Sequence, residues 1–312
     1  MKLTFLGTSA GMPTTTRNVS GLGLQWVQLG SLWLFDCGEA TQHQILRSPL
    51  KLSQLENIFI THLHGDHVFG LPGLLASRSQ GKDIQTAVTV YGPPGLDEYL
   101  RIVLSLTNTH LGYPLRVETV EPGRIFEDET RWVECQRLAH RVETFGYAAI
   151  EKPRPGEFDV AKARELGIPA GPLYGQLKNG ETLTLQDGRV IEGIDLVGPE
   201  RPGRKVVVCG DTGVTPAVAE LAMSADVLVH EATFLNEQAA RALESGHATA
   251  AQAAAAARDA GVQTLILTHF SARYESDGGS RMAELLAEAQ AIFPNTLLAR
   301  DFWSYDVPPQ HV

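Results

Sequence analysis

The sequence predicts a layered α/β fold, and two patterns carry that prediction. Short β-branched and aliphatic runs alternate with segments of helical periodicity along the 312 residues. Consecutive strands dominate the first part of the chain, whereas the last third alternates strand with helix. Hydrophobic residues make up 43% of the chain and charged residues 20%, so a sizeable core can cover both kinds of element. A disordered, collagen-like or fibrous chain is excluded.

Ten apolar runs have the length and the β-branched content of strands, and the clearest helices lie late in the chain. Thr215 and Pro216 mark a helix start, because proline is favoured at the first helical position. Thr249 is the predicted N-cap of an alanine-rich helix that Gly261 ends, and residues 276–291 form another amphipathic helix. The predicted strands span residues 2–6, 24–28, 31–35, 57–61, 87–91, 116–120, 132–139, 205–209, 227–230 and 264–268.

Residues 151–203 differ from the rest of the chain in composition. They hold six of the 17 prolines and nine of the 30 glycines, which interrupt helices and strands. A connection of this length is uncommon unless it has a function. We therefore predict a single domain over residues 1–312, with residues 151–203 as an inserted, flexible and protruding arm that binds a partner. Residues 151–205 hold nine basic and nine acidic side chains, so the net charge of −10 lies outside them.

Charge, cysteine content and hydropathy exclude several classes of protein. The net charge of −10 excludes nucleic-acid binding through an extended basic coat. Cys37, Cys135 and Cys209 form neither a disulfide framework nor a cysteine-rich zinc finger, and we expect buried, reduced thiols in a cytosolic protein. The apolar residues 3–6 are too short a run for a signal peptide. No stretch approaches ~18 uninterrupted apolar residues, so no membrane span is expected.

The strongest chemical signal is the run THLHGDH at residues 61–67, directly after a predicted strand. In an extended backbone, residues two apart face the same way, so His62 and His64 are placed to share one ion. The glycine that follows permits a sharp turn, which directs Asp66 and His67 toward a second position. Three imidazoles and a carboxylate suit zinc or another borderline divalent metal.

Further metal-ligating residue types follow other predicted strands. Asp211, His230 with Glu231, and His269 each lie at the carboxyl end of an apolar run, and His140 follows another. Ligand sites in α/β proteins lie outside the carboxyl ends of strands, so several such ends in one chain are expected to converge. Each residue alone is a weak signal, since Asp211 could cap a turn and His269 could pack in the core.

Together these segments resemble the metallo-β-lactamase superfamily, whose signature is His-x-His-x-Asp-His. The resemblance implies a four-layer αββα sandwich, in which helices flank two mixed sheets and a dinuclear metal site lies along one edge. It implies two Zn²⁺ ions per subunit, with Mn²⁺ as the other option. The implied ligands are His62, His64 and His140 for one ion, Asp66, His67 and His269 for the other, and Asp211 as a bridge between them.

Within that superfamily the chain resembles the ribonuclease Z family, the endonucleases that mature the 3′ end of transfer RNA. The inserted residues 151–203 resemble the family's exosite arm, which grips the elbow of the transfer RNA. Two positions depart from the family: Thr15 stands where a lysine is common, and Ala248 stands where a small polar residue is usual. The resemblance runs nearly end to end and is carried by residues 7–13, 17–18, 36–41, 230–233, 246–250, 269–274 and 299–302.

The resemblance also implies a reaction and its participants. A metal-activated water would attack the phosphodiester, leaving a 3′-hydroxyl on the transfer RNA and a 5′-phosphate on the trailer. Asp66 would be the general base, His247 would protonate the departing 3′ oxygen, and Glu231 would orient His247. The substrate would be precursor transfer RNA, and the protein a cytoplasmic homodimer. The candidate contacts to RNA are Arg17, Asn18, Lys178, Ser271 and Arg273.

Three alternatives remain open at this point. Another dinuclear metallo-hydrolase, either a phosphodiesterase or a glyoxalase II-like thioesterase, would use the same metal ligands, although the insertion and the His247 segment favour the nuclease. A di-iron redox protein of this fold usually carries glutamate at the second ligand position, where this chain has His64. A non-catalytic RNA-binding relative typically loses metal ligands, whereas all seven positions are occupied here.

Overall fold

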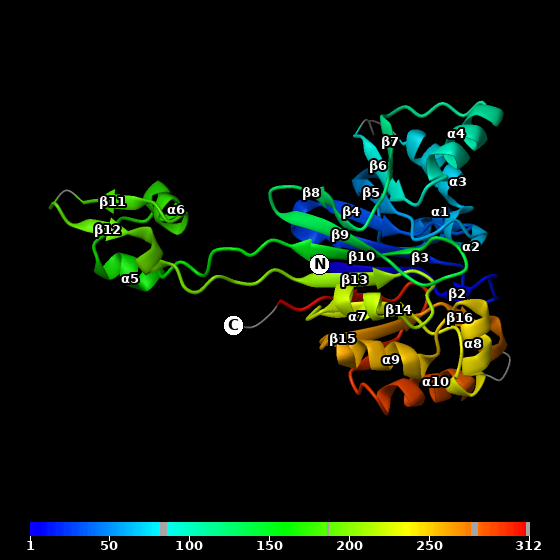
Figure 1. Ribbon diagram of the computed structural model, residues 1–312. Helices are drawn as coiled ribbons and strands as arrows, with labels where there is room; N and C mark the ends of the chain where they lie inside the picture. The colour runs from blue at the N-terminus through cyan, green and yellow to red at the C-terminus, as the bar shows by residue number, and fades with distance from the viewer. Residues whose placement is uncertain (82–85, 186, 276–279, 310–312) are drawn as a thin grey trace. The chain divides into compact units, whose positions relative to one another are not determined.

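The computed structural model describes residues 1–81, 86–185, 187–275 and 280–309. The chain divides into two compact units (Figure 1). The larger unit consists of residues 1–150 and 205–308, and the smaller unit contains residues 151–204. The predicted metal-ligating residues all belong to the larger unit.

Two seven-stranded sheets form the larger unit, and both are mixed. In the first, β1, β3 and β4 are antiparallel neighbours, and β4 to β7 are parallel. Its order is β18 (Ser304–Asp306), β1 (Lys2–Gly7), β3 (Gly21–Trp26), β4 (Ser31–Phe35), β5 (Leu55–Phe59), β6 (Val88–Gly92) and β7 (Leu115–Thr119). The order of the second is β17 (Thr296–Leu298), β15 (Thr264–Thr268), β14 (Val227–Glu231), β13 (Lys205–Cys209), β10 (Phe145–Glu151), β9 (Arg131–Arg137) and β8 (Gly123–Glu127).

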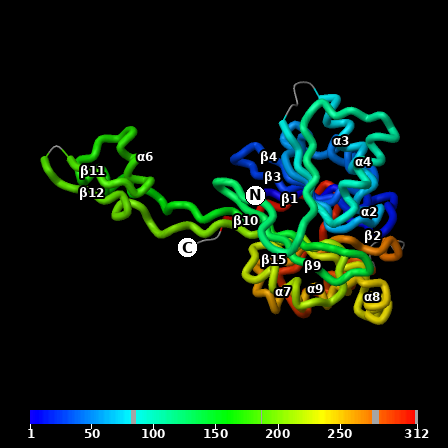
Figure 2. The backbone as a smooth tube through the Cα atoms, turned by 45° about the horizontal axis from the view of Figure 1, so that its top comes forward, coloured from blue at the N-terminus to red at the C-terminus, as the bar shows by residue number. Residues whose placement is uncertain are grey.

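Helices cover the outer face of each sheet (Figure 2). Three apolar clusters pack between the layers. Phe5, Trp33 and Tyr147 belong to the cluster between the sheets. The outer face of the first sheet is covered by α1 (Thr41–Leu46), α3 (Leu71–Ser79) and α4 (Leu96–Leu106). The second is covered by α7 (Pro216–Ala222), α9 (Ala250–Asp259) and α10 (Ser280–Gln290). The four-layer αββα arrangement is the one that the resemblance implies.

All ten predicted strands are present, and the bounds of β4, β13 and β15 are those predicted. The remaining seven are shifted by one to three residues at an end. The prediction missed β10, although all seven of its residues are buried. Its sequence FGYAAIE contains only one β-branched residue and, because both faces are covered, no alternation of apolar with polar side chains. The prediction also missed β8, a five-residue strand with three exposed positions, and the three-residue strands β17 and β18.

The two helix starts predicted from caps are confirmed. Thr215 Oγ1 accepts a hydrogen bond from Ala217 N at the start of α7. Thr249 and Gln252 form a reciprocal capping box at the start of α9. The predicted helix at 276–291 is observed as α10, and residues 276–279 lie outside the described residues. The larger unit also contains β2 (Ser9–Ala10), α2 (Gly65–Val68), α8 (Ala239–Ser245) and β16 (Phe270–Ser271).

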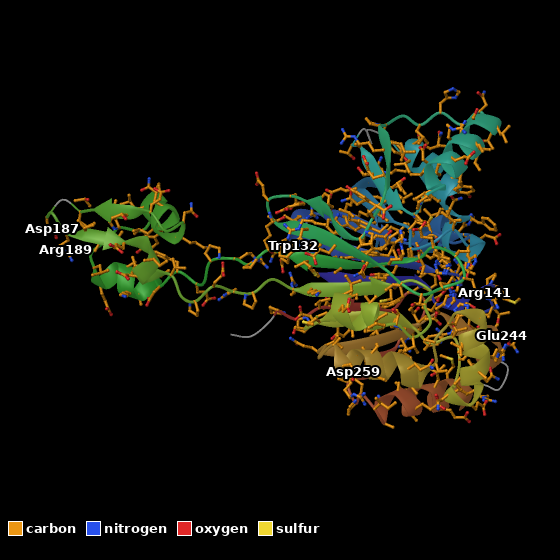
Figure 3. All side chains as sticks on the ribbon, viewed as in Figure 1. Trp132, Arg141, Asp187, Arg189, Glu244 and Asp259 are labelled. Carbon is orange, nitrogen blue, oxygen red and sulfur yellow. The ribbon has the colours of Figure 1, made fainter. Side chains whose placement is uncertain are left out.

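The smaller unit has secondary structure and a core of its own. It consists of α5 (Val160–Glu165), α6 (Pro172–Lys178) and a hairpin of β11 (Thr182–Thr184) with β12 (Val190–Glu192). Asp187 and Arg189 form an ion pair in the loop of that hairpin, with 2.7 Å between Oδ2 and Nε (Figure 3). Five buried apolar side chains pack together: Ala163, Ile168, Leu177, Ile191 and Leu196.

The three cysteines are free and buried, as expected. Burial raises the pKa of the Cys135 thiol and that of the Cys209 thiol to about 12. Both side chains are therefore neutral packing groups at neutral pH. Across the described part of the chain, no helix has the length and apolar character that a membrane crossing needs.

Candidate metal centre

The candidate ligands gather beyond the carboxyl ends of strands from both sheets. His62 and His64 follow β5, while Asp66 and His67 lie in the short helix α2. Asp211 follows β13, and the preceding residue, Gly210, packs closely against Thr61. A Cβ atom on Gly210 would lie 2.4 Å from the Cβ of Thr61. Glycine is therefore required for the two sheets to bring Asp211 and the histidine loop together.

A first cluster consists of three imidazoles and one carboxylate. His62 Nε2 lies 3.0 Å from His64 Nδ1, and His140 Nε2 lies 3.3 Å from the same atom. Asp211 Oδ2 lies 3.7 Å from His62 Nε2. His62 is fully buried, whereas His64 and His140 are half-buried, so the cluster is open on one side.

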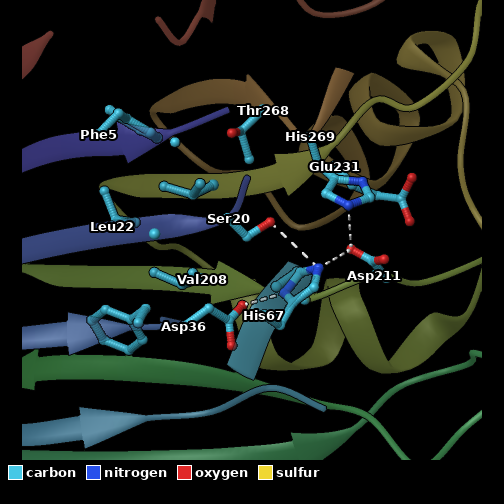
Figure 4. Close-up of a pocket in the computed structure, with 16 residues that line it drawn as sticks. Phe5, Ser20, Leu22, Asp36, His67, Val208, Asp211, Glu231, Thr268 and His269 are labelled. Atoms are coloured by element: carbon cyan, nitrogen blue, oxygen red, sulfur yellow. Dashed lines mark hydrogen bonds and ion pairs between the residues drawn. The ribbon is translucent and has the colours of Figure 1, made fainter. Parts of the chain in front are cut away.

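A second cluster shares Asp211 with the first. Asp211 Oδ1 lies 3.4 Å from His67 Nε2 and 3.3 Å from His269 Nε2. Asp66 Oδ2 lies 3.4 Å from each of the same two nitrogens. Figure 4 shows Asp211 between His67 and His269. One carboxylate oxygen of Asp211 faces each cluster.

The spacing of these atoms fits two divalent ions. Ligand atoms about 2.0–2.1 Å from a tetrahedral zinc ion are about 3.3–3.4 Å apart, and the donor separations in both clusters lie close to that value. Within each cluster the ligand atoms all lie within 4.8 Å of one another. The donor set of imidazole nitrogen and carboxylate oxygen suits zinc and other borderline metals. The geometry can therefore hold one ion in each cluster, with Asp211 between them.

Hydrogen bonds on the far side of three of the imidazoles set their orientation. His67 Nδ1 lies 2.7 Å from Asp36 Oδ2, and His140 Nδ1 lies 2.6 Å from the carbonyl oxygen of Gly246. His269 Nδ1 lies 2.9 Å from Thr233 Oγ1. Such partners hold a ring so that its other nitrogen carries the lone pair toward the metal. In these three rings that nitrogen is Nε2.

Asp36 is a functional residue that the sequence patterns did not identify, although it lies in the family-like segment 36–41. Asp36 follows β4 and accepts hydrogen bonds from Thr61 N at 2.8 Å and Thr61 Oγ1 at 2.9 Å, in addition to its contact with His67. Its φ angle of 57° is left-handed, which is uncommon outside glycine and turns the carboxylate toward the cluster. A carboxylate at the end of an apolar strand was the available signal, since the same pattern identified Asp211.

Two of the candidate ligands, His62 and Asp66, are in the protonation states that metal binding requires. Burial, reinforced by the neighbouring His67, lowers the pKa of His62 to about 2, so its ring is neutral. Burial by itself would raise the pKa of Asp66. Hydrogen bonds from His269 and His67 outweigh that effect and hold the pKa well below its usual value. Neutral imidazole and ionised carboxylate are the metal-binding forms of these side chains.

His247 and Glu231 form a pair beside both clusters. His247 Nδ1 lies 2.9 Å from Glu231 Oε1, and the ring centre of His247 is 5.0 Å from that of His140 and 5.6 Å from that of His269. Burial opposes the protonation of His247, but the hydrogen bond and the charge of Glu231 raise its pKa. Burial would raise the pKa of Glu231, and the hydrogen bond from His247 lowers it instead. The contact between the two side chains therefore favours an imidazolium beside a carboxylate.

Three backbone and side-chain donors hold the Glu231 carboxylate in place. Thr212 N donates to Oε1 at 2.8 Å, Ala248 N donates to Oε2 at 3.1 Å and Thr233 Oγ1 donates to Oε2 at 2.6 Å. The side chain of Glu231 is 1% exposed, whereas that of His247 is 17% exposed. Glu231 therefore holds His247 through Nδ1 from the buried side, and the other ring nitrogen of His247, Nε2, is open to a ligand.

Two of the predicted RNA contacts have intramolecular partners in the N-terminal loop. Arg17 pairs with Glu275 at 2.7 Å and donates to Thr8 Oγ1 at 2.6 Å. Asn18 Nδ2 donates to the carbonyl oxygen of Glu39 at 2.8 Å. The same loop contacts the metal centre through Gly11 N, which donates to Asp66 Oδ2 at 2.9 Å.

The other three predicted contacts lie elsewhere. Arg273 Nε donates to Ser271 Oγ at 2.9 Å, and Arg273 Nη1 donates to Gln238 Oε1 at 2.7 Å. Both residues are half-buried and lie two and four residues after His269 along the chain. Lys178 is exposed at the end of α6 in the smaller unit.

Comparison with known proteins shows similarity along the whole chain. A family model described as "Anti-Pycsar protein Apyc1" matches residues 1–120, and one described as "Beta-lactamase superfamily domain" matches residues 192–270. Ribonuclease Z of Brevibacillus brevis is 56% identical over 308 residues, which cover 98% of this chain and 97% of that protein. Ribonuclease Z of Trichodesmium erythraeum is 54% identical, with 99% and 96% covered.

The fold is also that of a solved structure. The crystal structure of the human tRNase Z, short form, aligns with a TM-score of 0.72 at 31% identity, covering 99% of this chain and 100% of that chain. This chain therefore has the metallo-β-lactamase fold that its histidine motif predicts.

Proposed function

Because the chain belongs to the ribonuclease Z family, the metal-dependent endoribonucleases that process the 3′ end of transfer RNA, we propose that its two clusters hold two zinc ions. With these ions bound, the protein cuts the 3′ trailer from precursor transfer RNA. The observation that carries the proposal is the placement of Asp211, which offers one oxygen to each cluster. A shared carboxylate is the arrangement expected of a two-metal hydrolase.

The proposed ligands are His62, His64 and His140 for one ion, Asp66, His67 and His269 for the other, and Asp211 for both. When bound, the ions supply an activated water and neutralise the charge that accumulates on the phosphate in the transition state. Manganese would suit the same donor atoms, and the spacing of the nitrogens favours zinc.

Asp66 is proposed as the general base. Its Oδ2 atom is held by Gly11 N at 2.9 Å, and its carboxylate is ionised at neutral pH because its pKa lies well below the usual value. An ionised carboxylate beside both clusters is placed to accept the proton of the attacking water. The amide of Gly11 then fixes the orientation of the acceptor.

His247 is proposed as the general acid. Glu231 holds Nδ1 at 2.9 Å, so Nε2 carries the proton that a departing 3′ oxygen needs. The raised pKa of His247 favours the protonated ring that a general acid needs. An alkoxide is a poor leaving group, and protonation by a positioned side chain typically contributes about 10²–10⁴-fold to the rate. The products are a 3′-hydroxyl on the transfer RNA and a 5′-phosphate on the trailer.

The smaller unit is proposed as the exosite arm that binds the folded RNA. It is compact, and its nine acidic and eight basic residues leave it nearly neutral in a chain of net charge −10. Repulsion of a phosphate backbone is therefore weakest there. Lys178 is exposed on α6 and is the proposed phosphate contact, with Arg17, Asn18, Ser271 and Arg273 as further contacts near the metal centre. We also propose a homodimer that acts in the cytoplasm, and the free cysteines support the reducing compartment.

Incubation with a 3′-extended precursor transfer RNA, with and without a chelator, tests the proposal. We expect a single cut at the 3′ end of the mature sequence that disappears with the chelator and returns with zinc. Cleavage of bis(p-nitrophenyl) phosphate without cleavage of the RNA by the zinc-loaded protein would assign a different hydrolase activity to the same ligands. Metal analysis of the same preparation should give two ions per chain.

A further inference from the structure

A pocket of about 200 Å³ lies between α7 and α9, outside the metal centre. His230 lines the pocket, whereas the next residue, Glu231, contacts His247 at the metal centre. Consecutive strand residues face opposite sides of a sheet, so the pocket and the metal centre lie on opposite faces of β14. A cavity of about 150 Å³ is large enough to bind benzene, so this pocket has room for a somewhat larger aromatic molecule.

Most of the pocket wall is apolar. Val218 and Ala219 of α7 face it from one side, and Ala255 and Ala256 of α9 face it from the other. These side chains are short, which leaves the space between the two helices unfilled. Transfer of an apolar ligand surface from water into such a space is favourable by about 25 cal/mol per Å².

His230 supplies a buried hydrogen-bond acceptor to this pocket. The residue is 2% exposed. Its Nδ1 atom lies 2.7 Å from the carbonyl oxygen of Glu231, which can only accept, so Nδ1 carries the hydrogen. Burial lowers the pKa of His230, so the ring is neutral and Nε2 keeps a lone pair. No donor among the described residues lies within hydrogen-bond distance of Nε2, so a ligand in the pocket can supply one.

The amide oxygen and the carboxylate at the rim each have a partner within the chain. Gln252 Oε1 accepts from Thr249 N at 2.9 Å, and Asp259, labelled on α9 in Figure 3, accepts from Arg258 at 2.8 Å. The remaining N–H groups of Gln252 are donors. A cation therefore finds no unpaired carboxylate in the wall, and a neutral molecule with one donor matches the lining.

The pocket wall is made of the same segments as the catalytic pair. Gly213 lies two residues after Asp211, His230 directly precedes Glu231, and Ala248 directly follows His247; all three line the pocket. Ala248 N also donates to Glu231 Oε2 at 3.1 Å. A molecule in the pocket that displaces Ala248 therefore changes the hydrogen bonds that hold Glu231 and His247 in place.

We propose that this pocket binds a neutral, largely aromatic small molecule with a single N–H or O–H donor, and that occupancy lowers turnover at the metal centre. The donor bonds to His230 Nε2 and the ring packs between α7 and α9. The proposed binding depends only on the pocket, whereas the proposed effect on turnover rests on the proposed function. A ligand shifts turnover only as far as it binds one arrangement of the catalytic pair more tightly than another.

Indole and 1-methylindole test the binding site, because they share a ring system and only indole has an N–H donor. Calorimetric titration of the zinc-loaded full chain should give one site per chain. Indole should bind about five-fold more tightly, as expected for one neutral hydrogen bond. In His230→Phe the preference for indole should disappear, and equal affinities in the unsubstituted protein would overturn the assignment of His230 as the acceptor.

A second pair of variants separates pocket filling from unfolding. Ala255→Trp places a large side chain in the pocket and should abolish indole binding, whereas Glu220→Trp, on an exposed position of α7 outside the pocket, should bind indole normally. Both melting temperatures are expected to stay near that of the unsubstituted protein. If Ala255→Trp changes the molar mass measured by light scattering, the pocket is an interface between copies of the chain and the proposal fails.

Turnover of bis(p-nitrophenyl) phosphate at saturating indole completes the test. We expect kcat to fall several-fold in the unsubstituted protein and to be insensitive to indole in Ala255→Trp. Saturable binding with unchanged kcat would overturn the coupling, and absence of binding would overturn the site. If the ligand-free protein cleaves neither RNA nor ester, the proposed function fails while the titration still decides whether the site exists.

Discussion

The two units of this chain differ in how much apolar surface holds them together. The larger unit buries three apolar clusters around two seven-stranded sheets, whereas the smaller unit buries a single cluster of five side chains. The candidate metal ligands and the His247–Glu231 pair lie in the larger unit alone. Side chains that must keep their spacing within tenths of an ångström need a rigid scaffold, while a surface that contacts a folded RNA does not. The comparison therefore predicts that chemistry and RNA binding can be separated.

Among substitutions in the larger unit, removal of the Asp211 carboxylate is expected to cause the largest loss of metal and of activity. Asp211→Ala should lose both ions and reduce turnover by about 10³-fold or more, because both clusters share this carboxylate. Metal content by plasma mass spectrometry and cleavage of precursor transfer RNA measure the two effects. Asp187→Ala in the smaller unit, which removes only an exposed ion pair, is the matched control and should keep both ions. Two ions retained in Asp211→Ala would contradict the shared-ligand arrangement.

His247→Ala should separate metal binding from proton transfer within the larger unit. We expect two ions per chain and a loss of about 10²–10³-fold in RNA cleavage, since the 3′ oxygen then leaves without a proton. Cleavage of bis(p-nitrophenyl) phosphate should fall much less, because p-nitrophenolate leaves unprotonated. Equal losses on both substrates would argue against the role of general acid. Glu231→Gln, which keeps the shape of the side chain, should give a smaller loss of the same kind.

Asp36→Asn tests how much the hydrogen-bond partners of the ligands contribute to metal affinity. The amide cannot stabilise the imidazole of His67 as the carboxylate does at 2.7 Å. Loss of such a partner typically costs about 10–100-fold in metal affinity or activity. Zinc affinity by competition with a chromogenic chelator measures it, and Asp128→Asn, distant in sequence and partnered by Arg131, serves as the control. An unchanged zinc affinity would remove Asp36 from the metal centre.

Deletion of the smaller unit tests the separation directly. Ile150 of β10 pairs with Lys205 of β13 in an antiparallel register, so an Asn-Gly turn can replace residues 151–204 and close a hairpin. We expect KM for precursor transfer RNA to rise about 10-fold or more at unchanged metal content, with hydrolysis of bis(p-nitrophenyl) phosphate unaffected. Equal loss on both substrates would mean that residues 151–204 support the metal centre rather than bind RNA.

Leu177→Ala is expected to have the smallest effect on chemistry. Leu177 is fully buried in the cluster of the smaller unit, and truncation of such a side chain costs about 2–4 kcal/mol. Hydrogen exchange should speed up in α5, α6 and the β11–β12 hairpin alone. Ester hydrolysis should be unchanged, and faster exchange in β13 or β14 would show that the two units unfold together.

The local parts of the fold were predictable from the sequence. Strands β4, β13 and β15 are runs of apolar side chains with clear ends, and the start of α9 is a capping box, so near neighbours along the chain decide them. The strand β10 was not predictable in this way. Its glycine and two alanines are compatible with many structures, and only the covering of both faces in the assembled sandwich makes them a strand.

The sequence by itself determined which residues are able to bind metal, since the run at 61–67 holds three imidazoles and a carboxylate within six residues. It also determined that other candidates follow strands. Only the tertiary structure decided that Asp211 lies between the clusters, that Asp36 hydrogen-bonds to His67, and that Arg17 forms an ion pair with Glu275. The physical reason is that local propensity acts over a few residues, whereas these contacts join residues far apart in the chain and exist only once the two sheets have packed.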